Sequence, residues 1–285
     1  MPAPYPVAWR AKGGHGMDLG LQGQVVLVTG AGQGLGREIG LAFAREGAHV
    51  AFHYRSSGAG AEEAAAEAGR LTGAALAVQA DVRSDDEVTA AVEAVESQLG
   101  PIGVLVNNAA ATGSKRFLDT TPEDWALQVD VTVTGTLRVT QTVARRMVDR
   151  SPSGGHPRAP GSGVIVSLMG DSGRVGESGL SVTATTRAST MALTKSLAKE
   201  LARFGIRANC VSIGLVQTDR FDEHAGLSGA GAPDEERMKK ILAQYPLRRL
   251  GRPSDVSPLV LLLASPLSGW ITGQVISVNG GYAMP

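Results

Sequence analysis

The residues of this chain best suited to bind a charged ligand are the glycines of VTGAGQGLGRE, residues 28–38, which follow an apolar run. Gly30, Gly34 and Gly36 allow a tight turn, close approach of the backbone to a phosphate, and close packing of a helix on a strand. A helix that begins here directs its N–H groups at negative charge. The stretch predicts a site for a dinucleotide pyrophosphate, although a plain tight turn would use the same glycines.

A second polar group ends the next apolar run, in HYRSS. Arg55, Ser56 and Ser57 stand where an acidic residue would accept the ribose hydroxyls of NAD. Because a guanidinium and hydroxyls can hold a 2′-phosphate, the sequence favours NADP(H) over NAD(H). The alternative is a solvated arginine in a turn, since the glycine stretch carries Gln33 and no second basic residue.

Alternating strands and helices must position these groups. Short β-rich runs are expected at 24–29, 49–54, 75–80, 103–107, 163–168, 207–213 and 274–278. Alanine-rich helical patterns lie between them, and Ser84 is suited to cap the helix of DDEVTAAVEAVESQL. Apolar strands separated by helices predict an α/β fold with a doubly wound parallel sheet, covered on both faces, whose ligands bind at the carboxyl ends of the strands.

Composition excludes several classes of function. Lys plus Arg equals Asp plus Glu, at 27 each, and no basic stripe suggests nucleic acid. The chain has neither a secretory h-region nor eighteen consecutive apolar residues, so we expect a cytoplasmic protein and no membrane partner. The single cysteine, Cys210, excludes an internal disulfide and is typical of a buried strand. No histidine has the spacing of a metal site, so no metal is expected.

The chain is expected to form one domain over residues 18–285, after a flexible extension at 1–17 rich in Pro and Gly. Met17 is an alternative to Met1 as the initiator methionine. Residues 149–163, with turn-forming residue types and no periodicity, predict an exposed loop inside this domain. Apolar residues at helical spacing predict a helix over SVTATTRASTMALTKSLAKEL, residues 181–201.

Six motifs together resemble the short-chain dehydrogenase/reductase (SDR) family, from about residue 18 to the end. They are TGAGQGLG (29–36), ADV (80–82), NNAA (107–110), ALTKSLAKEL (192–201), IRANCVSIGLVQT (206–218) and ITGQVISVNGG (271–281). The resemblance implies a Rossmann-type domain of about seven parallel strands, a homodimer or homotetramer, and a small-molecule substrate under a lid at 219–250. APDEERMKKILAQY would form the helix of this lid.

The resemblance also implies a set of cofactor-binding residues. From the glycine loop to the nicotinamide end these are Gly30, Gln33, Gly34, Leu35, Gly36, Arg55, Ser56, Asp81, Val82, Asn108, Ala109, Ala110, Arg187, Gly214, Val216 and Thr218. Asp81 and Val82 would flank the adenine, and Gly214, Val216 and Thr218 would approach the nicotinamide.

The family performs its chemistry with an asparagine, a serine, a tyrosine and a lysine, and all four are replaced here. The matching positions are Thr132, Gly170, Thr183 and Arg187. The Thr183 hydroxyl cannot ionise near neutral pH, and Arg187, with an ordinary pKa above about 12, can bind ribose hydroxyls and not relay a proton. General acid–base catalysis contributes about 10²–10⁴-fold, so hydride transfer without it would be slow.

The loop GDSGRVGES, residues 170–178, offers Asp171, Ser172, Arg174 and Glu177 as replacements, although glycine-flanked charges on loops are mostly solvated. Asp171 is the candidate acid or base, because a carboxyl against an apolar nicotinamide face could have a raised pKa. Three hypotheses stay open. The first is an NADP(H)-dependent oxidoreductase with a non-standard mechanism. The second is a non-redox lyase, isomerase or cyclase that uses the same pocket with or without bound nucleotide, so that no cofactor need be used in turnover. The third is a catalytically silent subunit beside an active SDR partner.

Overall fold

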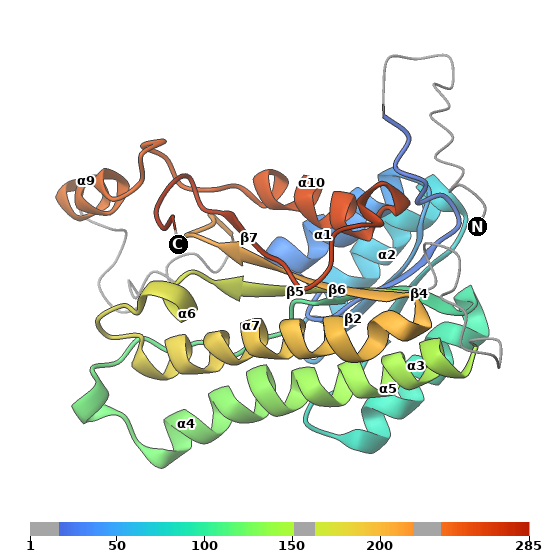
Figure 1. Cartoon of the computed structure of the whole chain (residues 1–285), viewed down its shortest axis with the longest axis horizontal. Coiled ribbons are helices and arrows are strands. Elements are labelled where there is room, and N and C mark those ends of the chain that lie inside the picture. The colour runs from blue at the N-terminus through green and yellow to red at the C-terminus, as the bar shows by residue number, and fades with distance from the viewer. Residues whose placement is uncertain (1–16, 151–162, 219–234, 285) are drawn as a thin grey trace.

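The computed structural model describes residues 17–150, 163–218 and 235–284 and has a seven-stranded parallel sheet at its centre (Figure 1). The strands are β1 (Val25–Val28), β2 (His49–Tyr54), β3 (Ala75–Gln79), β4 (Ile102–Asn107), β5 (Gly163–Gly170), β6 (Ile206–Ile213) and β7 (Val275–Val278). Their order is β3-β2-β1-β4-β5-β6-β7, and every neighbouring pair is parallel. The predicted doubly wound α/β fold is confirmed.

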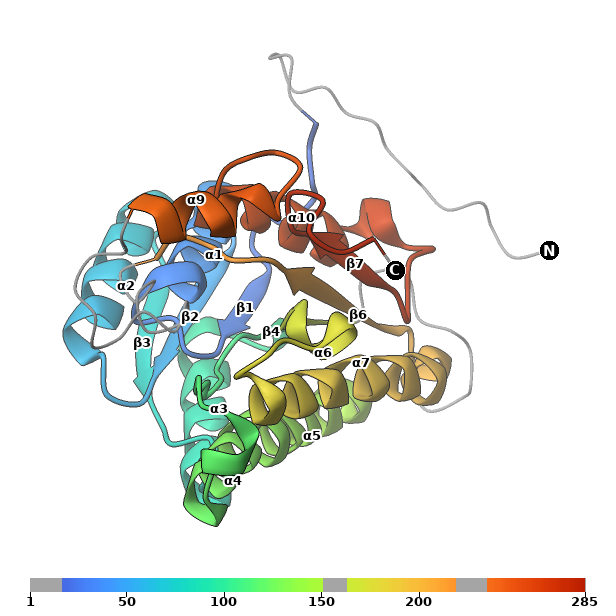
Figure 2. The same ribbon diagram turned by 90° about the vertical axis from the view of Figure 1, so that its left-hand side faces the viewer.

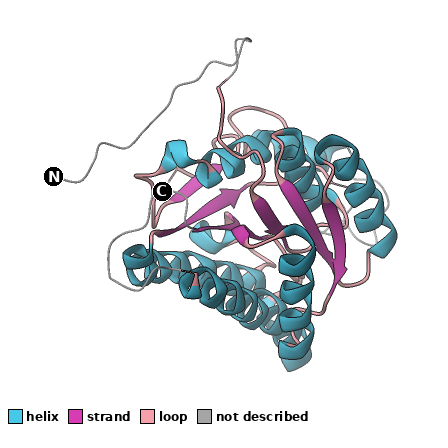
Figure 3. Ribbon diagram, turned by 90° about the vertical axis from the view of Figure 1, so that its right-hand side faces the viewer, coloured by secondary structure: helices cyan, strands magenta, loops and turns pink. Residues whose placement is uncertain are grey.

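Helices cover both faces of the sheet (Figure 2; Figure 3). One face carries α1 (Gly34–Arg45), α2 (Gly58–Thr72) and α10 (Pro253–Ala264), and the other carries α3 (Asp85–Leu99), α5 (Gly135–Asp149) and α7 (Ser181–Leu201). Successive strand residues point to opposite faces. In β1, Val26 and Val28 pack in the core under α1, α2 and α10, whereas Val25 and Leu27 pack in the core under α3, α5 and α7.

Local sequence signals explain the bounds of α3. The Ser84 hydroxyl accepts a hydrogen bond from the Glu87 N–H at 3.3 Å, as predicted. Three acidic residues occupy the first turn, where negative charge meets the positive end of the helix dipole. The helix ends before Gly100, whose φ of 96° is accessible to glycine at little cost.

The strand order reverses its direction around β1, which lies between β2 and β4. The connections after β1 and β4 therefore leave the sheet on opposite sides, which opens a crevice at the carboxyl ends of the strands. Asn108, just after β4, spans this point, because its side-chain amide donates to the carbonyl oxygens of Thr29 at 2.9 Å and Gly30 at 3.0 Å. The glycine loop is thus tied to the end of β4.

The helix α7 has the predicted bounds, and threonines make up most of its buried face. Its buried residues are Thr183, Thr186, Thr190, Thr194 and Ala198. The hydroxyls of Thr186 and Thr194 donate to the backbone carbonyls of Thr183 and Thr190 on the same helix. A threonine bonded in this way presents mainly its methyl group to a neighbour, which lets a row of polar residues pack like an apolar stripe.

The remaining elements connect these layers. They are η1 (Phe117–Asp119), α4 (Pro122–Gln128), the π-helix η2 (Val129–Thr134), α6 (Ser172–Val175), η3 (Ala202–Phe204), α9 (Glu235–Ala243) and η4 (Pro266–Ser268). The helix α9 lies within the predicted lid helix. Residues 1–16 of the predicted extension, most of the predicted loop at 149–163 and the first part of the lid, 219–234, lie outside the described residues. The two ends of that predicted loop are regular structure instead, because Asp149 belongs to α5 and Gly163 begins β5. In the described ranges, no helix has the length and apolar character needed to cross a bilayer.

Candidate functional site

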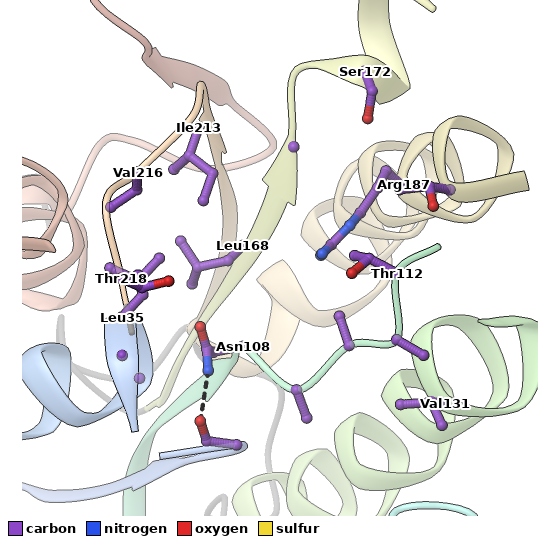
Figure 4. Close-up of a pocket in the computed structure, with 18 of the residues that line it drawn as sticks. Leu35, Asn108, Thr112, Val131, Leu168, Ser172, Arg187, Ile213, Val216 and Thr218 are labelled. Carbon is purple, nitrogen blue, oxygen red and sulfur yellow. Dashed lines mark hydrogen bonds between the residues drawn. The ribbon is translucent and has the colours of Figure 1, made fainter. Parts of the chain in front are cut away.

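A cavity of about 470 Å³ opens at the carboxyl ends of the strands (Figure 4). Every residue that the sequence predicted as cofactor-binding lines it: Gly30, Gln33, Gly34, Leu35, Gly36, Arg55, Ser56, Asp81, Val82, Asn108, Ala109, Ala110, Arg187, Gly214, Val216 and Thr218. Four of the five candidate catalytic residues also line the cavity: Gly170, Asp171, Thr183 and Arg187. The fifth, Thr132, does not.

The glycine loop has the geometry of a phosphate cradle. Gly30 and Gly34 have φ values of 63° and 55°, in the left-handed region that favours glycine. A side chain on Gly30 would begin 3.0 Å from the Ala109 Cα, too close for ordinary contact. The helix α1 starts at Gly34 without a side-chain cap and without an acidic residue in its first turn. Its N-terminus can therefore receive an anion.

The glycine loop is hydrogen-bonded to His53, a buried residue of β2. The Gly30 N–H donates to His53 Nδ1 at 3.2 Å, and His53 Nε2 lies 3.0 Å from the Ala80 carbonyl oxygen. This pair of contacts assigns the neutral imidazole, with its proton on Nε2. Burial lowers the pKa of His53 from 6.5 to about 4. The sequence gave no sign of the bond between His53 and Gly30.

Arg55 is exposed just after β2, and its guanidinium has no hydrogen bond or ion pair with any described residue. Arg37, the nearest basic residue along α1, is engaged with Glu63 and Glu67. Asp81, which also lines the cavity, is bound by Arg83, and this hydrogen bond is the main cause that lowers the pKa of Asp81 to about 2. Arg55 thus keeps its hydrogen-bond donors available for a phosphate at this end of the cavity, although its charge also acts on Asp81.

Two of the positions at which the sequence predicts a replaced catalytic residue, Thr132 and Thr183, brace the chain after β4. The Thr132 hydroxyl accepts from the Ala111 N–H and donates to the Ala111 carbonyl oxygen, both at 3.1 Å. The Thr183 hydroxyl accepts from the Gly113 N–H at 3.2 Å, and its proton can go to the Gly113 carbonyl at 3.0 Å or to Gln128 Oε1 at 2.7 Å. Both hydroxyls are already satisfied by the protein itself.

Arg187 differs from these two residues, because its guanidinium extends into the cavity (Figure 4). No described residue forms a hydrogen bond or an ion pair with it. Burial lowers the pKa of Arg187 to about 10, below the ordinary arginine value assumed from the sequence. A largely desolvated cation without a counter-charge is costly, and acceptor groups on a ligand would relieve this cost.

Asp171, the predicted acid or base, is 2% exposed and has both carboxylate oxygens engaged. Oδ1 accepts from the Ser212 hydroxyl at 2.5 Å, and Oδ2 accepts from the Asn279 amide at 2.6 Å. These bonds join the end of β5 to β6 and to the chain after β7. The geometry gives Asp171 a positioning task, and its acid–base role stays a prediction.

The sequence did not single out Glu177 as an acid, and it missed Tyr282. Both line the cavity, and their side chains interact. Burial is the main cause that raises the pKa of Glu177, and it also raises the pKa of Tyr282 to about 12. Tyr245 is 4% exposed and stacks on Tyr282 with ring centroids 5.1 Å apart. The one sequence signal for Glu177 and Tyr282 was that each follows a strand whose carboxyl end lies at the same edge of the sheet.

Within the described ranges, no three His, Cys, Asp or Glu side chains come together as a metal site. Cys210 is buried in β6, and burial raises the pKa of its thiol to about 12. A thiol with so high a pKa is a poor nucleophile at neutral pH.

Comparisons with known proteins agree with this geometry. A family profile described as enoyl-(acyl carrier protein) reductase matches residues 30–283. The chain is 36% identical over 258 residues to the 3-oxoacyl-[acyl-carrier-protein] reductase FabG of Staphylococcus aureus strain Mu50, covering 90% of this chain and 97% of that protein.

Two solved structures are also similar. A putative short-chain alcohol dehydrogenase from Sinorhizobium meliloti has a TM-score of 0.81 at 29% identity, over 92% of this chain and 96% of that chain. A 7α-hydroxysteroid dehydrogenase complexed with NADH and 7-oxo glycochenodeoxycholic acid has a TM-score of 0.81 at 30% identity, over 93% and 96% of the two chains. The chain belongs to the short-chain dehydrogenase/reductase family of oxidoreductases.

Proposed function

We propose that this protein is an NADP(H)-dependent oxidoreductase that interconverts a small carbonyl compound and its alcohol by a non-standard route for the proton. The observation that carries this proposal is a pair of arginines in the wall of one cavity, Arg55 and Arg187, whose guanidinium groups form no hydrogen bond or ion pair with any described residue. The uncapped N-terminus of α1 lines the same cavity. Three separate features thus suit a ligand with several phosphates and ribose hydroxyls.

The residues present fit a dinucleotide with a 2′-phosphate. The N-terminus of α1 would receive the pyrophosphate, and Arg55 would bind the phosphate on the adenosine ribose. One solved relative is described as a complex with NADH, but in this chain Arg55 and Ser56, not an acidic residue, follow β2. Arg187 would bind the nicotinamide ribose. When bound, the reduced cofactor supplies a hydride to the carbonyl carbon.

The proton must come from a group other than Thr183. Glu177 is half-buried in the cavity wall, and its raised pKa keeps part of the population protonated closer to neutral pH. During reduction, the pair of electrons of the C=O π bond moves to oxygen as the hydride adds to carbon. Glu177 donates its proton to that oxygen and recovers a proton from water. Asp171 is the alternative donor, but it would first have to release Ser212 or Asn279.

A catalytically silent subunit is the second candidate. It is supported by the structural use of the Thr132 and Thr183 hydroxyls, which leaves two of the four family positions without a free reacting group. In that case the cofactor would bind without turnover, and the chain would stabilise an active relative. Assembly as a homodimer or homotetramer and a cytoplasmic location remain predictions for either candidate.

Calorimetric titration with NADPH, NADP⁺, NADH and NAD⁺ tests the cofactor proposal. We expect micromolar NADPH binding and at least a tenfold preference over NADH. Oxidation of NADPH at 340 nm with a panel of ketones, aldehydes and quinones then tests the reaction. Binding without turnover of any probe would favour the silent subunit, and no binding of any nucleotide would refute both.

A further inference from the structure

We propose that Ser172 donates a hydrogen bond to the substrate carbonyl oxygen, from a position beside the one that Gly170 leaves without a side chain. This inference rests on the proposed carbonyl reduction. It adds a catalytic residue that the match to the family positions does not identify.

The first observation is the distance between Ser172 and the missing side chain at Gly170. Gly170 is the last residue of β5 and lines the cavity. A Cβ built on Gly170 would lie 3.5 Å from the Ser172 Oγ. The Ser172 hydroxyl therefore borders the space into which a side chain at position 170 would extend.

The second observation is that this hydroxyl has no partner. Ser172 is 6% exposed, yet its Oγ forms no hydrogen bond with any described residue. Figure 4 shows the hydroxyl directed into the pocket on the side of Arg187. Because Ser172 also lines the cavity, this unpaired hydroxyl can donate to an acceptor on a ligand bound there.

The third observation is that the residues on both sides of Ser172 are fixed. Asp171 is anchored by Ser212 and Asn279. Gly173 lies so close to α7 that a Cβ there would meet the Arg187 Cβ at 2.9 Å and the Ala188 nitrogen at 2.8 Å. Glycine at 173 thus permits the docking that directs Ser172 into the cavity. A donor held in place before the reaction stabilises developing negative charge without reorganisation.

Other hydroxyls near this end of the cavity are less suitable. Thr183 is bound to Gly113 and Gln128, and Thr132 is bound to Ala111 and lies outside the lining. Thr112 lines the cavity but is exposed, so water competes for its hydroxyl. Ser172 alone among these four combines burial, a free donor and a rigid backbone.

The role of Ser172 in the step is electrostatic. As the hydride adds to the carbonyl carbon, negative charge develops on the oxygen, and the Ser172 O–H donates a hydrogen bond to it. Ser172 keeps its proton throughout, because Glu177 delivers the proton that completes the alcohol. In the reverse direction the same hydrogen bond stabilises the alkoxide before the hydride leaves.

The test compares Ser172→Ala with the wild type and with Ser178→Ala. Ser178 is an exposed serine on the same loop and does not line the cavity. Turnover is measured from NADPH oxidation with 9,10-phenanthrenequinone, ethyl acetoacetate and acetoacetyl-CoA. We expect kcat of Ser172→Ala to fall roughly 10²-fold, the loss typical of removing one oxyanion donor, and Ser178→Ala to match the wild type. NADPH affinity and melting temperature should not change.

A second readout does not depend on turnover. Isobutyramide, a carbonyl compound that is not reduced, is titrated into the protein saturated with NADPH. We expect Ser172→Ala to weaken its binding by about five- to tenfold, as for one lost hydrogen bond. Adding Gly170→Ser to Ser172→Ala should restore at least a tenfold part of the lost kcat, because it supplies a hydroxyl to the same space.

The outcomes separate this inference from the proposed function. Unchanged kcat and unchanged amide binding in Ser172→Ala would overturn the role of Ser172 and leave the reaction standing. A parallel loss of NADPH affinity would also overturn it, because it would indicate a structural role. Failure of the wild type to reduce any probe while NADPH is bound would overturn the proposed reaction, and the role of Ser172 with it.

Discussion

His53 holds the glycine loop by a bond that protonation would break. Its Nδ1 accepts the Gly30 N–H, and Nε2 faces the Ala80 carbonyl. A proton on Nδ1 would set a donor against a donor. Burial lowers the pKa of His53 from 6.5 to about 4, so the folded protein prefers the neutral ring. The stabilisation is complete above pH 6.5 and is lost as the pH falls from 6.5 towards 4.

The magnitude follows from the two pKa values. A lowering from 6.5 to about 4 is worth about 3 kcal/mol in total, of which roughly 2.5 kcal/mol is lost between pH 7.5 and pH 4.5. In His53→Gln the side chain does not titrate, so this part of the pH dependence disappears. The variant should be less stable than the wild type at pH 7.5, because glutamine cannot bond to both Gly30 and Ala80.

The assay is urea unfolding followed by circular dichroism at pH 7.5, 5.5 and 4.5. Carboxylates with lowered pKa values, such as Asp81 and Asp255, also contribute less to the free energy of unfolding in acid, and they do so in both proteins. Only the difference between the two proteins therefore reports on His53. We expect the advantage of the wild type to shrink by roughly 2.5 kcal/mol between pH 7.5 and 4.5. Parallel loss of stability in the two proteins would refute the reasoning.

Three further predictions concern the cavity. Arg55→Ala should weaken NADPH binding by about 10–100-fold and leave NADH binding within twofold, because the charge-assisted contact to the 2′-phosphate is lost; calorimetry would measure both. Thr183→Val should destabilise the fold by about 1–3 kcal/mol in urea unfolding, because Gly113 and Gln128 lose a buried partner, whereas Thr185→Val on the exposed side should cost much less. Carbonyl reduction should slow as pH rises through the raised pKa of Glu177, and Glu177→Gln should be slow with no such decline.

The sequence was sufficient for the fold because its signals are local. Alternating apolar runs and helical patterns, the glycine turn and the Ser84 cap each depend on a few neighbouring residues. The bonds that decide how the site works join distant parts of the chain: Gly30 to His53, Gly113 to Thr183, and Asp171 to Asn279. No periodicity reports such pairs, because they arise only when the parallel strands bring their carboxyl ends to one edge.

The buried face of α7 could not be predicted from the sequence for a different reason. Hydropathy counts threonine as polar, but the hydroxyl of Thr186 or Thr194 can bond to its own helix and leave a methyl group to pack. The chemistry of Ser172 was hidden similarly, because a match of family positions directs attention to residue 170. Its relevance depends on the fold around Gly173.

The bare guanidinium of Arg187 has a consequence for handling the protein. A desolvated charge that no described residue neutralises makes the empty protein less stable than its packing would allow. Any molecule that offers Arg187 an acceptor while binding only the folded state raises the melting temperature in proportion to the logarithm of its concentration over its dissociation constant. The melting temperature of the protein therefore reports ligand binding directly. A thermal-shift screen of metabolites, carried out with and without NADPH and in a buffer free of phosphate, would rank substrates before any turnover is seen.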